Sequence, residues 1–75
     1  MRQIAIIPRP GHELGVELHA SISYLRNSAI AARSAVIGQK SACIWVLSED
    51  ISAAVKALRN AGFDATALIE TEVSN

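Results

Sequence analysis

The sequence predicts one domain of the α/β (α+β) class, in which a four-stranded antiparallel sheet carries two helices on one face in the order βαββαβ. Two short apolar runs, 3–7 and 41–47, have the length of buried strands. The segment 48–63 shows helical spacing of apolar residues and signals for both helix ends. A chain of 75 residues has room for a single domain, 1–75.

The first strand is expected at 3–7, "QIAII", which is rich in β-branched residues and is followed by Pro8. A short, continuously apolar run is typical of a strand that is buried on both faces. The next residues, "PRPG" (8–11), contain both prolines of the chain and a glycine, a combination that ends a strand and turns the chain.

The apolar residues of the segment 12–37 fit both the spacing of a helix and the alternation of a strand. A helical stripe is formed by Leu14, Leu18, Ile22 and Leu25. The same region alternates like a strand over 16–24. We predict a helix at 12–26, because a proline-glycine turn followed by Glu13 and Glu17 suits a helix start.

A second strand is expected at 28–38, "SAIAARSAVIG", which leads through a hairpin turn at 38–40 into the strand at 41–47, "SACIWVL". Cys43 lies inside this last strand, where a buried and inert thiol is the common case. Trp45 is expected either in the core or at a contact between subunits.

The segment 48–63, "SEDISAAVKALRNAGF", predicts the second helix. Ser48 is expected to accept a hydrogen bond from a free N–H at the helix start. Gly62 is expected to end the helix in a left-handed conformation, with Phe63 folded back onto Leu58.

The segment 64–73 alternates apolar and polar residues, as an edge or half-exposed strand does. The most apolar runs, 3–7 and 41–47, are then the central strands of a ferredoxin-like sandwich. One copy would leave the second face of the sheet bare. Because a core this small is marginal and the single Cys43 excludes an intrachain disulfide, we expect a homodimer or a higher homo-oligomer.

The order of these elements resembles the ACT domain, a small-molecule-sensing module attached to many proteins of amino-acid metabolism. The resemblance is carried by a strand that leads to Pro10-Gly11 and a helix bearing Leu14, by the "IGQK" hairpin, and by "SEDISAAVKALRNAGFDA", which is similar to the second helix of that family and its Ala-Gly-Phe stop. Arg9 stands where many members have Asn or Asp.

The resemblance implies an allosteric regulatory domain that binds an amino-acid effector at a subunit interface, with a metabolic enzyme as an associated partner. By position, the ligand-binding residues would be Pro10, Gly11, His12, Glu13 and Leu14 after the first strand, with Asn27, Ser28, Ala29 and Ile30 in the second half of the site.

Helix geometry is compatible with this implied site. A helix start preceded by glycine presents free N–H groups and a partial positive charge, which suits the carboxylate of an amino acid. In the simpler interpretation the turn at 8–11 only reverses the chain. Arg9 and Arg33 are expected to face solvent, and Glu13 and Glu17 to form a solvated pair of like charge.

Other functions find less support in the sequence. Seven basic residues balance seven acidic ones and three residues are aromatic, which argues against nucleic-acid binding. There is no apolar run of membrane length and no signal-like N-terminus, so we expect a cytoplasmic protein with no membrane partner.

No nucleophile motif or phosphate loop is present, so we expect neither an enzyme nor a cofactor. His12 and His19 would stand about 10 Å apart on one helix, too far for one subunit to hold a metal with both. The alternatives that stay open are a ligand-free dimerisation or assembly module and, as the weakest, a metal-binding sensor built across subunits.

Overall fold

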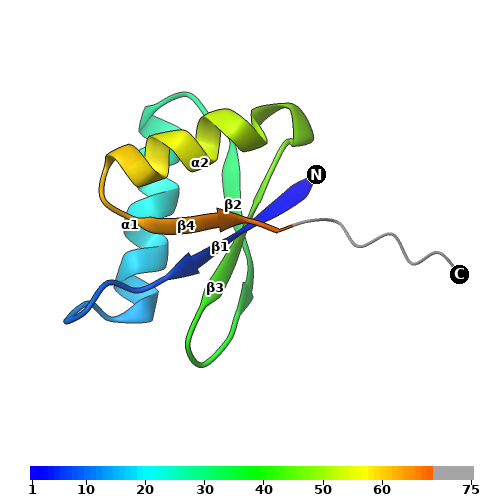
Figure 1. Cartoon of the computed structure of the whole chain (residues 1–75). Helices are drawn as coiled ribbons and strands as arrows, with labels where there is room; N and C mark the ends of the chain where they lie inside the picture. Colours follow the sequence, from blue (N-terminus) through cyan, green and yellow to red (C-terminus); the bar gives the residue numbers. More distant parts are fainter. Residues whose placement is uncertain (69–75) are drawn as a thin grey trace, which may run out of the picture.

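The computed structural model describes residues 1–68. Its elements are β1 (Arg2–Ile7), α1 (Leu14–Asn27), β2 (Ala32–Ile37), β3 (Ala42–Val46), the 3-10 turn η1 (Ser48–Asp50), α2 (Ile51–Asn60) and β4 (Asp64–Ala67). The strands form one antiparallel sheet in the order β2-β3-β1-β4, and both helices pack on one face of it (Figure 1). The predicted ferredoxin-like α+β fold is therefore confirmed, with the two most apolar strands at its centre.

The central strands alternate between a buried and an open face. Ile4 and Ile6 of β1 and Ile44 of β3 are completely buried against the helices. On the other side Ala5 is only half-buried and Ile7 is 46% exposed. The expectation that 3–7 is buried on both faces is wrong, because the two helices cover only one face of the sheet and alternate residues point away from them.

Helix α1 decides between the two periods of the segment 12–37 in favour of the helix. It begins at Leu14, later than predicted, because the preceding residues form a tight turn in which the His12 N–H donates to the Arg9 carbonyl at 3.0 Å. At its other end the Ile30 N–H donates back to the Leu25 carbonyl at 2.9 Å, with Ala29 in the left-handed region at φ 64°. This helix-end turn occupies residues 28–31 and delays the start of β2.

The β2–β3 hairpin forms where it was predicted. The Gly38 N–H donates to the Ser41 carbonyl at 2.8 Å, and Ile37 pairs with Ala42 across the turn. The ladder shifts register between Ser34 and Val36, so β2 contains a bulge.

The predicted helix at 48–63 is divided into η1 and α2. Ser48 does not cap it as expected: the residue before α2 is Asp50, and neither η1 nor α2 begins with a side-chain cap hydrogen bond. The predicted end is confirmed. Gly62 has φ 95°, and the Phe63 N–H donates to the Leu58 carbonyl at 2.9 Å.

Strand β4 pairs only with β1 and is therefore an edge strand, as predicted. Its buried Ala65 alternates with the exposed Thr66. The remainder of the predicted strand, 69–73, lies outside the described residues. No helix in the described part of the chain has the length and apolar character that a membrane span requires.

Candidate functional site

The loop between β1 and α1 is built on a reverse turn. Pro10 and Gly11 are its central residues, Gly11 has φ 84°, and the His12 N–H closes it onto the Arg9 carbonyl. Proline at the first central position and a left-handed glycine at the second are the signature of a type II turn. The sequence "PRPG" thus ends β1 and turns the chain toward α1.

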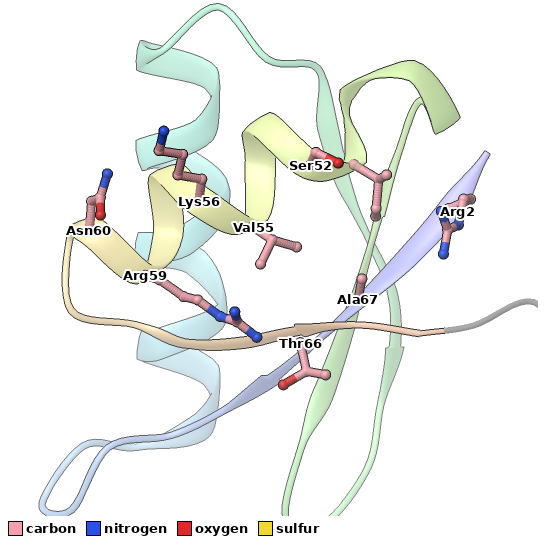
Figure 2. Close-up of a pocket in the computed structure, with 9 residues that line it drawn as sticks. Arg2, Ser52, Val55, Lys56, Arg59, Asn60, Thr66 and Ala67 are labelled. Atoms are coloured by element: carbon pink, nitrogen blue, oxygen red, sulfur yellow. The ribbon is translucent and has the colours of Figure 1, made fainter.

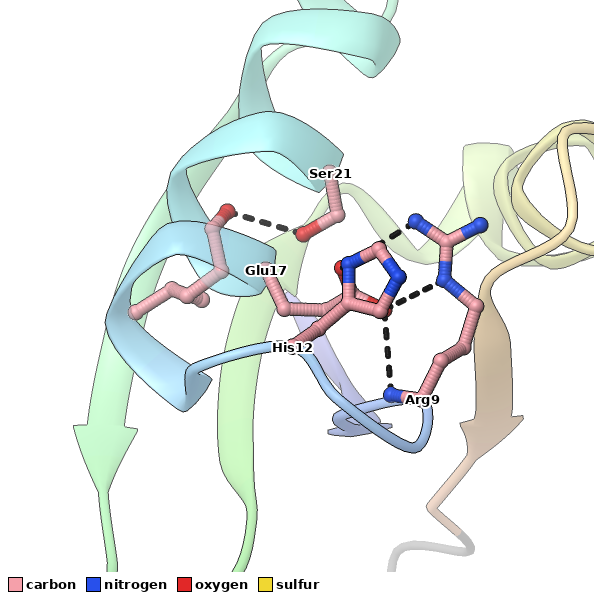
Figure 3. Close-up of polar contacts among 5 residues, drawn as sticks. Arg9, His12, Glu17 and Ser21 are labelled. Carbon is pink, nitrogen blue, oxygen red and sulfur yellow. Dashed lines mark hydrogen bonds and ion pairs between the residues drawn. The ribbon is translucent and has the colours of Figure 1, made fainter.

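Arg9 ties this loop to α1 through a carboxylate that is almost fully buried (Figure 3). Its Nε lies 2.7 Å from Oε2 of Glu17 and its Nη2 lies 3.1 Å from Oε1, so the pair is bidentate. The Arg9 backbone N–H adds a longer hydrogen bond to Oε2 at 3.3 Å. The Glu17 side chain is 1% exposed and that of Arg9 is 33% exposed.

Three further residues lie close to the ion pair: Phe63, Gly62 and His12. The Arg9 guanidinium carbon lies 4.7 Å from the centre of the Phe63 ring, in cation–π geometry. A Cβ at Gly62 would lie 3.1 Å from Nη1 of the same guanidinium. His12 places its Nδ1 3.5 Å from Oε1 of Glu17. Arg9 therefore connects the β1–α1 loop, α1 and the α2–β4 connection.

This arrangement corrects two expectations. Glu17 was expected on a solvated face and Arg9 in solvent, yet Glu17 is buried and Arg9 is its partner. Glu17 is one turn after Leu14 and directly before Leu18, on the apolar stripe of α1, and that position was the available sequence signal. Charged residues at such positions are buried only when they are paired.

The ion pair changes the acidity of Glu17. The hydrogen bonds from the Arg9 guanidinium lower the pKa of Glu17 below its ordinary value of 4.5 and outweigh burial, which acts in the opposite direction. The positive charge of Arg9 and the nearby His12 lower the pKa further. Glu17 is thus an ionised structural group.

The predicted ligand-binding residues lie in two separate places. One group is exposed or half-exposed at the start of α1: Pro10, Gly11, His12, Glu13 and Leu14. The other is exposed or half-exposed at its far end: Asn27, Ser28, Ala29 and Ile30. The 14 residues of α1 separate the groups by about 20 Å (Figure 1). A single copy does not bring the two halves together.

The start of α1 is open. Glu13 precedes the helix in an extended conformation and makes no side-chain cap hydrogen bond. A Cβ added at Gly11 or Gly15 would meet no atom of residues 1–68 within 4 Å apart from those of its chain neighbours and, for Gly15, the adjacent backbone of α1. The first N–H groups of α1 are therefore accessible to an anion, as expected for an uncapped helix start.

The residues discussed as metal ligands or interface anchors are spread over the fold. His12 and His19 are exposed, and the part of the chain that the structure describes holds no cluster of three or more His, Cys, Asp or Glu side chains. Cys43 is half-buried on the open face of the sheet, not fully buried as expected, because its neighbours Ala42 and Ile44 take the positions facing the helices. Trp45 lies on the same open face, opposite Gln3 in the ladder.

Among the pockets that residues 1–68 form, two lie elsewhere on the surface. One, of about 580 Å³, is between α2 and the β4 edge, and the other, of about 350 Å³, is beside the end of α1. Neither is lined by a predicted ligand-binding residue. The larger pocket includes Arg2 and Arg59, which sequence reasoning did not single out. They are distant in the chain, and no local motif joins them.

No protein-family model, no curated protein and no solved structure was found to match this chain. The class of the molecule is therefore set by its fold: a ferredoxin-like α+β sandwich with a topology that is consistent with ACT-like folds.

Proposed function

We propose that this chain is a small ACT-like regulatory domain that self-associates and binds an amino-acid-like ligand between two copies. The β1–α1 loop of one copy supplies one half of the site, and the α1–β2 turn of a neighbour supplies the other. The associated partner is a metabolic enzyme whose activity the ligand controls.

The observation that carries the proposal is the open start of α1. Gly11 and Gly15 leave the backbone uncovered, and no side chain caps the helix. Free N–H groups and the helix dipole favour a carboxylate at this position. The Arg9–Glu17 pair holds the loop in place without covering it.

The need for a second copy follows from the geometry of α1. The two groups of predicted residues lie at opposite ends of the helix, so a ligand that contacts both must bridge two chains. A ligand that binds the dimer and not the monomer stabilises the dimer by mass action. Regulation by such linkage requires no further conformational change within one copy.

The test is a thermal-shift screen of the full chain with the twenty amino acids, each at millimolar concentration. We expect one of them to raise the Tm and to strengthen dimerisation in analytical ultracentrifugation. Gly11→Asn keeps a residue that tolerates the left-handed turn and places a side chain over the open backbone, so it should abolish the shift. Lys40→Ala, in the β2–β3 hairpin, is the matched control and should retain it.

The proposal fails if none of the amino acids changes the Tm or the association state. It also fails if Gly11→Asn responds to the ligand as the unmodified chain does. A Gly11→Asn protein that retains its unliganded Tm ensures that a lost response reports on binding and not on folding.

A ligand-free assembly module is the second candidate, and the open face of the sheet favours it. In a single copy, Trp45 and Cys43 are only half-buried on this face, where Cys43 pairs with Ala5 of β1. Aromatic residues on an uncovered sheet face are typical anchors of a protein interface. Stable dimers together with no response in the amino-acid screen would favour this candidate.

A further inference from the structure

The larger pocket differs in chemistry from the β1–α1 loop. It lies between α2 and the outer edge of β4, and the start of β1 closes one end (Figure 2). Its cationic side chains are Arg2, Lys56 and Arg59, and among residues 1–68 its lining contains neither Asp nor Glu. A volume of about 580 Å³ is in the range of pockets that hold small molecules.

The two arginines lie at different ends of the pocket and are only partly used by the protein. The Arg59 Nε donates to the Ala65 carbonyl at 2.9 Å, which anchors the side chain along β4. The Arg2 Nη2 donates to the Leu68 carbonyl at 3.2 Å. The Arg2 Nε is buried and has no hydrogen-bond partner within residues 1–68. A buried guanidinium N–H without an acceptor is costly. Because the Arg2 Nε is closed off from solvent, an anion in the pocket would be held by the charge of Arg2 and not by this N–H.

The surface between the arginines is apolar. Val55 points from α2 toward the strand, and Ala67 lies opposite it, whereas Lys56 and Asn60 point away from the strand (Figure 2). Ile51, the first residue of α2, adds a buried side chain to the lining. The pocket therefore combines an apolar floor with fixed positive charges, which is the pattern expected for an organic anion.

We infer that this pocket is a second ligand site, independent of the proposed effector site, for a small organic anion. Its apolar body lies on Val55 and Ala67, and its carboxylate or phosphate accepts hydrogen bonds from the guanidinium of Arg59, with Arg2 adding positive charge at the other end of the pocket. Guanidinium groups suit both kinds of anion, because each presents two oxygens to the planar donor.

The test is an NMR titration of the ¹⁵N-labelled full chain with phenyl phosphate and with benzoate, which separate phosphate from carboxylate recognition. Benzyl alcohol is the neutral control. We expect saturable shifts for at least one anion at the amides of Val55 and Thr66 and at the Arg59 Nε–H. Benzyl alcohol should produce no saturable shift.

Variants identify the groups that bind. Arg59→Gln should weaken binding about tenfold or more, since it removes a charge-assisted hydrogen bond. Lys56→Gln leaves the hydrogen bond between Arg59 and the Ala65 carbonyl in place. Because it removes one exposed positive charge, it should weaken anion binding about two- to fivefold. Arg33→Gln is the matched control on the other edge strand and should bind normally. Unchanged Tm values for Lys56→Gln and Arg33→Gln keep folding separate from binding.

Three results would overturn the inference: no saturable shift with either anion, equal binding by Arg59→Gln, or equal shifts with benzyl alcohol. The chain also carries Glu70 and Glu72 of its own, and Glu70→Gln/Glu72→Gln tests them as competing anions. Binding that occurs only in this double variant would assign the pocket to the chain itself and would likewise overturn the inference.

Discussion

Arg9 and Glu17 form a bidentate ion pair, with the Arg9 Nε 2.7 Å from the Glu17 Oε2, and this pair joins the β1–α1 loop to the helix that follows it. Because the Glu17 side chain is 1% exposed, its charge depends on Arg9 for compensation. The loop that carries the proposed effector site is thus held by an interaction outside that site.

Glu17→Gln should lower the free energy of unfolding at pH 7 by about 1–3 kcal/mol, because the guanidinium loses its charged acceptor. The pKa of Glu17 is lowered from 4.5 in the folded state, so its contribution is complete above that pH and is lost as the pH falls through the lower folded-state value. The difference in the free energy of unfolding between Glu17→Gln and the unmodified chain should therefore narrow below about pH 4.5. Urea unfolding from pH 7 to pH 3 measures it.

The exposed Glu13 supplies the control for this experiment. Glu13→Gln should leave stability nearly unchanged across the same pH range, because the structure records no contact of its side chain with Arg9. A constant difference between Glu17→Gln and the unmodified chain from pH 7 to pH 3 would contradict the assignment of Glu17 as an ionised structural group.

Gly62→Ala should destabilise the fold by about 1–2 kcal/mol, because Gly62 is in the left-handed region at φ 95°. The added Cβ would also press on the Arg9 guanidinium. Gly15→Ala is the opposite case: it lies in α1 with open space around it and should stabilise by about 0.5–1 kcal/mol. Urea denaturation gives both values, and equal stabilities for the two variants would refute the prediction.

Ala29→Gly should stabilise the protein by about 0.5–1 kcal/mol. Ala29 ends α1 with φ 64°, a conformation that glycine adopts without the steric cost of a Cβ. The neighbouring Ala31→Gly is the control and should be slightly destabilising, because there the substitution only adds freedom to the unfolded chain. Differential scanning calorimetry distinguishes them, and a lower Tm for Ala29→Gly would count against this account of the turn.

Trp45→Ser should weaken self-association more than tenfold if copies pair through the open face of the sheet, since buried aromatic anchors carry much of the free energy of an interface. Val16→Ser is the matched control, because Val16 is 61% exposed on α1, away from that face. Sedimentation velocity over a range of concentrations reports both. Equal effects of the two variants would exclude the sheet face as the interface.

The local elements of the fold could be predicted because their signals lie within a few residues. Pro10 and Gly11 occupy the two positions that a type II turn requires, and Gly62 ends α2 as glycine commonly does. The predicted cap at Ser48 failed because a turn of 3-10 helix precedes α2 and moves its start to Ile51. Predicted boundaries were wrong where a turn occupies residues assigned to the neighbouring element. The turn at 28–31, for example, moves the start of β2 to Ala32.

The candidate sites were predicted less completely. Gly11 and His12 are exposed at the start of α1, whereas the second predicted group, 27–30, lies at the far end of that helix. Whether the halves meet depends on how two copies associate, which the pattern of one chain does not specify. Arg2 and Arg59 were not predicted as site residues, because they are far apart in the chain and no sequence motif contains both.

The sequence alone was enough to place the apolar strands near 3–7 and 41–47, the turn at Pro10-Gly11 and the stop at Gly62, since hydrophobic periodicity and backbone preferences act over one or two turns of chain. The inward turn of Arg9 to Glu17 and the shared pocket of Arg2 and Arg59 depend instead on how the folded elements pack. Burial of a charge and the grouping of cations depend on which surfaces pack together. That packing is a property of the whole sandwich, because each such contact joins segments that are separate in the chain.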